Sequence, residues 1–294
     1  MCVNSQRFFL YTVDCSSSSN AGQMAAQRYT SAGATNVHMY NESMMISAYP
    51  VLLEMGPKMV QACGTQWEAL SPFNTVSLAW GFHVEAILVW YTQCCGGGTH
   101  GAYSHVWVIE DDVGFSGDIV SSFLAHYATD TADLVSHTVQ PVYVPQVDRN
   151  GVAWCWINVI SQSFDQHVPH SFRWKGAEHV QRFSGRFLSA LDQLCSQGLT
   201  AWSEQAVPSL CAYLGMQQSS LLPHHIGTPF TWDGRVSESD WCKICSRETD
   251  SPESEERSKP EEMIASLPAA EVEPAEVEPR SISNSGKLYH ALKF

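Results

Sequence analysis

Long apolar runs and positive charge are both scarce in this chain. No apolar run approaches the roughly 20 residues that span a bilayer, so we expect no integral membrane segment. Lys and Arg number 16 against 30 Asp and Glu, which gives a formal net charge of −14. Non-specific binding to nucleic acid or to anionic membranes needs clustered Lys and Arg. We therefore expect no nucleic-acid partner.

The N-terminal residues MCVNSQRFFLYTVDC do not predict a signal peptide, because their apolar stretch is short and few positively charged residues flank it. Ten cysteines and one glycosylation sequon, Asn41-Glu42-Ser43, favour the oxidising secretory pathway instead. Free buried thiols explain the cysteines equally well. Cys242 and Cys245 have the spacing of half a zinc site, but no second half follows, which favours a disulfide or two free thiols.

Hydrophobic residues make up 44% of the chain, which is enough to form a substantial core. The acidic residues are uneven: residues 247–280 hold eleven acidic and four basic residues, and 270–279 repeat AEVEP twice. Such a Glu-, Pro- and Ser-rich stretch buries too little apolar surface to order itself. We expect a folded domain over residues 1–246 and a disordered acidic tail over residues 247–294.

The N-terminal pattern predicts a strand over residues 7–13, a helix over 21–30 and a strand over 36–40. Apolar residues recur at helical spacing over residues 76–91, 119–127 and 177–197. Strands are predicted at 106–109 and 132–136. Trp154 and Trp156 alternate about Cys155, so a strand there would point both rings to one face. This alternation of strands and helices predicts an α/β fold.

Three carboxylates, Glu110, Asp111 and Asp112, directly follow the apolar run at 106–109. That unbroken run fits a strand buried on both faces, as in a parallel sheet with helices above and below. Ligands bind at the carboxyl edge of such sheets, and adjacent carboxylates repel unless protons or a cation intervene. A divalent metal is the simplest resolution. The alternative is that these acids only solvate a strand end.

The loop DCSSSSN, residues 14–20, follows the first predicted strand and would lie at the same sheet edge. Asp14 and Ser16 are therefore candidate nucleotide contacts. A flexible serine linker is the competing interpretation. The glycines at 96–98 lie between a predicted helix and a predicted strand. A phosphate loop has the reverse order, from strand into helix, so we interpret these glycines as a connector.

Together these features resemble the GT-A-type glycosyltransferases, nucleotide-sugar-dependent enzymes built on a doubly wound, mostly parallel α/β sheet with helices on both faces. The resemblance rests on VWVIEDDV at 106–113 and covers roughly residues 7–245. Supporting stretches are ADLVS at 132–136, HVQRFSGRFLSAL at 179–191 and SEQAVPSLC at 203–211. It implies a nucleotide-sugar donor, a glycan or glycoprotein acceptor, and a Golgi or secretory location.

The resemblance also implies a bound Mn²⁺ or Mg²⁺ that neutralises the leaving diphosphate. Asp112 is the expected direct ligand, with Glu110 on the same strand face, and Asp111 would contact ribose or orient the metal's waters. His225 or His224 is the candidate further ligand from the C-terminal region.

For the transfer step, the resemblance points to Glu204 as general base if the stereochemistry inverts. The alternative is a carboxylate favoured at a helix N-terminus by the helix dipole. Four tryptophans are candidates for stacking on a sugar ring or, equally, for core packing: Trp154, Trp156, Trp202 and Trp232.

Two other functions compete with sugar transfer. A degenerate transferase-like domain would bind a glycan or a protein without catalysis. A metal-dependent phosphohydrolase would use the same carboxylates and histidines to release phosphate with water as acceptor.

Overall fold

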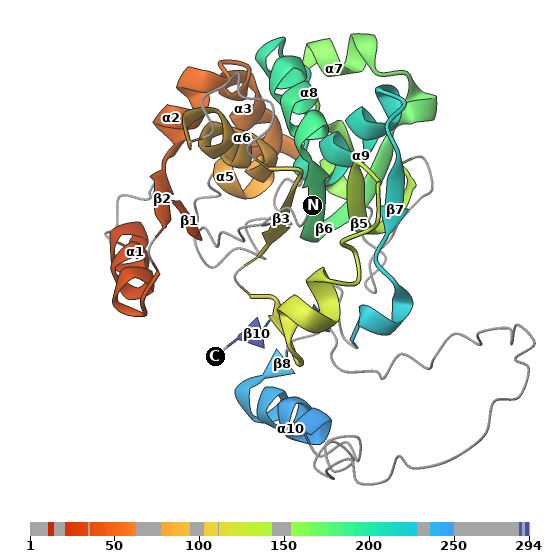
Figure 1. Cartoon of the computed structure of the whole chain (residues 1–294). Coiled ribbons are helices and arrows are strands. Elements are labelled where there is room, and N and C mark those ends of the chain that lie inside the picture. The colour runs from red at the N-terminus through yellow and green to blue at the C-terminus, as the bar shows by residue number, and fades with distance from the viewer. Residues whose placement is uncertain are drawn as a thin grey trace, which may run out of the picture. The chain divides into compact units, whose positions relative to one another are not determined.

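A computed structural model describes residues 11–14, 21–34, 36–62, 78–94, 103–110, 112–142, 154–227, 236–249, 288–289 and 292–293. Two compact units divide the chain (Figure 1). The first contains Met1–Ile109 and Thr131–Ser220, and the second contains Glu110–Asp130 and Leu221–Phe294. Among the described residues, no helix is both long and apolar enough to cross a membrane.

The first unit opens with the predicted strand, helix and strand. β1 (Tyr11–Asp14) pairs in parallel with β2 (Val37–Tyr40), and α1 (Ala21–Ser31) connects them and contacts both. The remaining elements of this unit are α2 (Glu42–Ala48), α3 (Leu52–Ala62), α5 (Leu78–Gly81), α6 (His83–Cys94), β3 (His105–Ile109), β5 (Leu134–Pro141), η2 (Cys155–Asn158), α7 (Gln162–His167), η3 (His170–Phe172), β6 (Trp174–Ser184), α8 (Gly185–Ser196), α9 (Ser203–Tyr213) and β7 (Gln218–Ser220).

The four-stranded sheet of this unit has the order β3-β6-β5-β7. β6 runs antiparallel to both β3 and β5, whereas β5 and β7 are parallel. The α/β class predicted from the sequence is therefore confirmed. The sheet is mostly antiparallel instead of mostly parallel, and a doubly wound parallel arrangement is not confirmed.

The antiparallel character comes from β6, which the sequence pattern assigned to a helix over 177–197. Residues Glu178 to Phe183 are all buried, because β6 lies between two strands and is covered on both faces. A strand of this kind shows no alternation of apolar and polar residues. Val180, Phe183 and Phe187 fall by coincidence at helical spacing across the junction with α8. Ser184 marks the true start of that helix, since its Oγ accepts a 3.1 Å hydrogen bond from the Phe187 N–H.

One further local expectation was wrong. Residues 155–158 form the 3-10 helix η2, so Trp154 and Trp156 do not alternate along a strand. α9 begins at Ser203 with Trp202 as its N-cap and keeps Pro208 inside the helix. Pro208 lacks the N–H that would otherwise bond to the carbonyl of Glu204, so α9 has one backbone hydrogen bond fewer than a regular helix.

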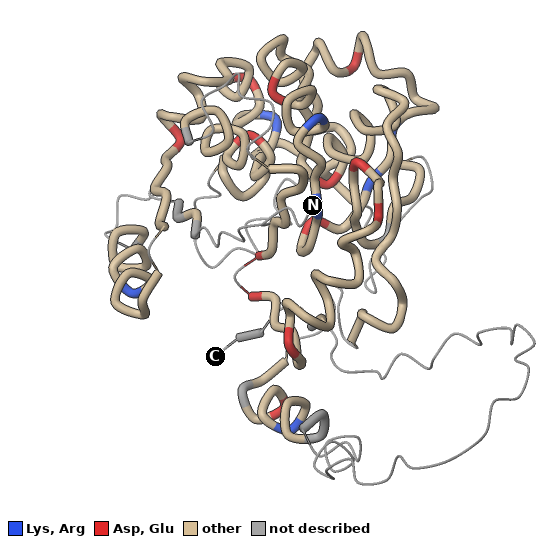
Figure 2. Tube along the Cα trace, in the orientation of Figure 1, with Lys and Arg blue, Asp and Glu red and all other residues tan. Residues whose placement is uncertain are grey.

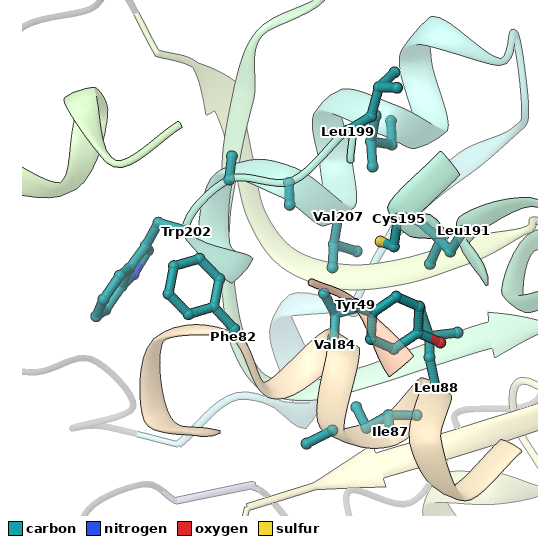
Figure 3. Close-up of a cluster of buried hydrophobic side chains, with 14 of the residues drawn as sticks. Tyr49, Phe82, Val84, Ile87, Leu88, Leu191, Cys195, Leu199, Trp202 and Val207 are labelled. Carbon is teal, nitrogen blue, oxygen red and sulfur yellow. The ribbon is translucent and has the colours of Figure 1, made fainter. Parts of the chain in front are cut away.

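The core of the first unit lies where α6 and α8 pack against each other and α9 lies along β6 (Figure 1). Figure 3 shows side chains from these elements and from the loops that join them meeting in one cluster. At its edge, the Tyr49 hydroxyl donates a 2.6 Å hydrogen bond to Asp192. The labelled members are Tyr49, Phe82, Val84, Ile87, Leu88, Leu191, Cys195, Leu199, Trp202 and Val207.

The second unit is built from short elements: β4 (Gly114–Phe115), η1 (Ile119–Leu124), η4 (Pro223–His225), β8 (Val236–Ser237), α10 (Glu238–Thr249), β9 (Leu288–Tyr289) and β10 (Leu292–Lys293). β4 pairs antiparallel with β9, and β10 pairs in parallel with β8. Asp118 caps η1, and its side chain accepts a 2.9 Å hydrogen bond from the Val120 N–H. Most of the predicted disordered tail, residues 250–287, lies outside the described residues.

The cysteines whose state is described divide into two groups. Cys155 is disulfide-bonded, whereas Cys195, Cys211, Cys242 and Cys245 are thiols outside any disulfide. Of the alternatives for the Cys242 and Cys245 pair, the structure has two thiols and not a disulfide. Figure 2 shows charged residues thinly spread along the described chain.

Candidate functional site

The acidic end of β3 is the first candidate site. Ile109 is the last residue of β3 and pairs with Val180 of β6, and Glu110 follows it directly. Glu110 and Asp112 are both half-buried, and the Glu110 carbonyl accepts a 3.2 Å hydrogen bond from the Val113 N–H. Asp111 lies outside the described residues. Two partly exposed carboxylates two positions apart offer the oxygen ligands that Mg²⁺ and Mn²⁺ prefer.

The predicted nucleotide loop is only partly described. Asp14 is the last residue of β1, and its backbone is in register with Tyr40 of β2. Ser16 lies outside the described residues. The nucleotide contacts expected of Asp14 and Ser16 therefore stay predictions.

Glu204 occupies a defined setting in the first turn of α9. Its side chain is buried, and Trp154 Nε1 donates a 2.9 Å hydrogen bond to Glu204 Oε2. Lys175 of β6 places its Nζ 4.5 Å from the centroid of the Trp154 ring. Burial lowers the pKa of Lys175, and the nearby charge of Glu204 opposes part of that shift. The carboxylate is thus oriented by an indole and flanked by an ammonium group.

The candidate tryptophans have different surroundings. Trp156 and Trp202 stack on each other, with ring centroids 3.9 Å apart and planes 5° apart, and both are buried. Trp80, which is partly exposed, contacts both rings edge-on. These contacts assign Trp156 and Trp202 to packing. Trp154 is half-buried beside Glu204, and Trp232 lies outside the described residues.

Three histidines meet in the second unit. His126 follows η1, and His224 and His225 are the last two residues of η4. One ring nitrogen from each lies within 4.8 Å of those from the other two. The ring centroids are 4.3 Å apart for His224 and His225, 5.0 Å for His126 and His225, and 5.7 Å for His126 and His224.

His225 is the most constrained member of this cluster, with 4% of its surface exposed. The Tyr127 hydroxyl lies 2.9 Å from His225 Nδ1, and the same hydroxyl accepts a 2.8 Å hydrogen bond from the Leu222 N–H. Burial, together with His224 and His126, lowers the pKa of His225 to about 4. The ring is therefore neutral at pH 7, which is the form that binds metals.

The predicted ligand set is only partly brought together. His225 meets His126 and His224, but within the part of the chain that the structure describes, no group of three combines His225 with Glu110 and Asp112. His126 was missed by the sequence reasoning, and so were Lys175 and the bond between Trp154 and Glu204. No local motif signals these residues, because each partner comes from a distant part of the chain.

Glu204 and the acidic strand end belong to different units, so each is described within its own unit. The two groups offer different chemistry: the acidic strand end suits an oxygen-preferring cation, and Glu204 suits proton transfer. Comparisons of this chain with protein-family models, with curated proteins and with solved structures give no match.

Proposed function

We propose that this protein is a metal-dependent glycosyltransferase that moves a sugar from a nucleoside-diphosphate sugar to an acceptor hydroxyl. The observation that carries the proposal is the placement of Glu110 and Asp112 directly after β3, a strand of the sheet in an α/β unit. Both carboxylates are half-buried, so they are partly shielded yet accessible to a ligand. The resemblance of residues 106–113 to the GT-A acidic motif gives the same assignment.

The donor set fits a hard divalent cation, because Glu110 and Asp112 supply carboxylate oxygens. When bound, Mn²⁺ or Mg²⁺ would neutralise charge on the leaving diphosphate. In this proposal Asp112 is the direct ligand and Glu110 supports it. Asp111 contacts ribose or the metal's waters, and Asp14 and Ser16 contact the nucleotide.

Glu204 is proposed as the base that takes the proton of the acceptor hydroxyl. Its support is the 2.9 Å hydrogen bond from Trp154 Nε1 to Glu204 Oε2, which orients the carboxyl group as a base requires. The helix dipole at the start of α9 favours the ionised form, which is the form a base needs. The acceptor in this proposal is a glycan or glycoprotein.

The metal role is tested by Asp112→Asn, which keeps the size of the side chain and removes its charge. In thermal-shift titrations, Mn²⁺ with a nucleoside diphosphate (UDP, then GDP) should raise the melting temperature of the wild type but not of the variant. Glu54→Gln is the matched control, since Glu54 is an exposed carboxylate in α3 and its removal changes the net charge equally. Equal shifts in Asp112→Asn and the wild type would move the metal elsewhere.

Glu204→Gln separates an enzyme from a binding domain. We expect it to keep metal-dependent nucleotide binding and to lose sugar transfer by about 100-fold or more, the typical contribution of a general base. The assay is transfer from a panel of nucleotide sugars, read as released nucleoside diphosphate with and without acceptor. Unchanged transfer in this variant would exclude Glu204 as the base. Nucleotide binding without transfer in the wild type would favour the degenerate domain, and release of inorganic phosphate would favour the phosphohydrolase.

A further inference from the structure

We propose that His126, His224 and His225 form a site for a borderline transition-metal ion, Zn²⁺ by its chemistry, which joins the two chain segments of the second unit. His126 belongs to the segment 110–130 and the paired histidines to the segment that begins at residue 221. The site is separate from the carboxylate site at Glu110 and Asp112, and it does not depend on the glycosyltransferase proposal.

The first support is the geometry of the donor atoms. Three imidazole nitrogens lie within 4.8 Å of one another. Zn–N bonds of about 2.0–2.1 Å in a tetrahedral site hold their nitrogens about 3.4 Å apart. In the proposed site the rings of His126 and His224, which are less buried than that of His225, turn until the three nitrogens reach that separation.

The second support is an unsatisfied polar atom. His224 Nε2 is shielded from solvent and makes no hydrogen bond to the protein. A buried donor or acceptor without a partner destabilises the folded state. A metal ion supplies the missing partner, because the lone pair of a neutral imidazole nitrogen is a metal ligand.

The third support is the surroundings of His225. Its Nδ1 lies 2.9 Å from the Tyr127 hydroxyl, and in the proposed site Nδ1–H donates to that oxygen, which leaves the lone pair of Nε2 for the metal. The Tyr127 hydroxyl is itself held by the Leu222 N–H, so the ring orientation is fixed. The buried Phe123 ring, with its centroid 5.3 Å from that of His225, limits solvent access on another side. Hydrogen bonds of this kind orient metal-binding histidines and set their tautomer.

The identity of the ion follows from the ligands. An all-nitrogen set suits Zn²⁺, Co²⁺, Ni²⁺ or Cu²⁺ and disfavours Mg²⁺ and Mn²⁺, which prefer oxygen ligands. Three protein ligands leave a fourth tetrahedral position for a water molecule. The two proposed sites therefore select different metals, and their failures are distinguishable.

The test uses the full chain, freed of metal with a chelator and titrated with Co²⁺ as a spectroscopic substitute for Zn²⁺. We expect one Co²⁺ per chain with the intense visible absorption of tetrahedral coordination, displaced by one equivalent of Zn²⁺. His126→Ala and His224→Ala should each weaken binding by at least about tenfold. Tyr127→Phe, which keeps all three ligands, should weaken it by about tenfold, as loss of an outer-shell partner does.

His170→Ala is the control, because His170 is an exposed histidine in the first unit. His126→Ala should also keep the Mn²⁺-dependent binding of nucleoside diphosphate that Asp112→Asn loses. Lack of Co²⁺ binding, a weak octahedral spectrum, or wild-type affinity in His126→Ala and His224→Ala would each overturn the proposal.

Discussion

Glu85 is a fully buried carboxyl group in α6 with no assigned role in either proposed site. Its Oε1 accepts hydrogen bonds from the Thr200 hydroxyl and, at 3.9 Å, from the Cys195 thiol. Its Oε2 has no hydrogen-bond partner. Burial raises the pKa of Glu85 to about 8, against 4.5 for the unperturbed group. The folded protein therefore holds this group as the neutral acid at pH 7.

The pH dependence of stability follows from that shift. The unfolded chain releases the proton near pH 4.5 and the folded chain only near pH 8, so the free energy of unfolding falls as pH rises between these values. Glu85→Gln should remove this fall and be the more stable protein at pH 9. The gain is of the order of 1.4 kcal/mol for each unit of the pKa shift. Urea denaturation at pH 5, 7 and 9 measures it, and Glu54→Gln serves as the exposed control.

If wild type and Glu85→Gln lose stability equally between pH 5 and 9, another group causes the loss. At this scale the sequence was informative for residues next to a clear pattern, such as Glu110, which directly follows the strand predicted at 106–109. It was not informative for Glu85, because a carboxylate inside an apolar helix looks the same in sequence whether it faces solvent or core.

At the scale of elements, Asp133 joins β5, α8 and β7. This buried carboxylate lies just before β5 and accepts hydrogen bonds from the Ser184 hydroxyl at 2.7 Å, from Arg186 Nε at 2.5 Å and from the Gln217 N–H at 3.1 Å. Burial alone would raise the pKa of Asp133, but the bonds from Arg186 and Ser184 outweigh it and lower the pKa. The group therefore stabilises the fold above pH 4 and loses that effect as pH falls further.

Asp133→Ala should lower the free energy of unfolding by roughly 2–3 kcal/mol, because it leaves buried donors from two elements without an acceptor. Arg186→Gln should cost less, since the Arg186 side chain is 70% exposed and water can replace its contact. Urea denaturation at pH 7 compares the two variants. A larger loss for Arg186→Gln would mean that the surface ion pair, and not the buried network, holds these elements together.

The strand β6 shows where local patterns fail, because both its type and its place in the sheet were mispredicted. Local spacing predicted the opening strand, helix and strand, the region of α6, and the existence of β3. The expectation that β3 is buried on both faces was wrong, because β3 lies at an edge of the four-stranded sheet, with residues 105–108 half-buried and Ile109 exposed. The apolar and polar residues of β6 follow no regular alternation. Its sequence therefore does not distinguish a central strand from a helix. The antiparallel placement of β6 depends on pairing with β3 and β5, which no local pattern contains.

At the scale of the whole molecule, the two candidate sites differ in how much of each can be predicted from the sequence. Glu110 and Asp112 are next to a recognisable strand, so their position at a strand end is predictable, and the metal site there stays a prediction. The histidine cluster is not, because its two segments are far apart: Tyr127 and His225, which share a hydrogen bond, are separated by 98 positions. The α/β class was predicted because it needs only the alternation of elements, whereas the division into two units needs long-range contacts.

The interruption of the first unit by residues 110–130 has a consequence during synthesis. At a translation rate of 5–20 residues per second, residue 126 leaves the ribosome roughly 5–20 s before residue 224. During that interval Phe123 and Tyr127, which are buried in the finished protein, have not yet met His225 and Leu222. The nascent chain therefore displays this aromatic segment to chaperones for many seconds before the second unit can close around it.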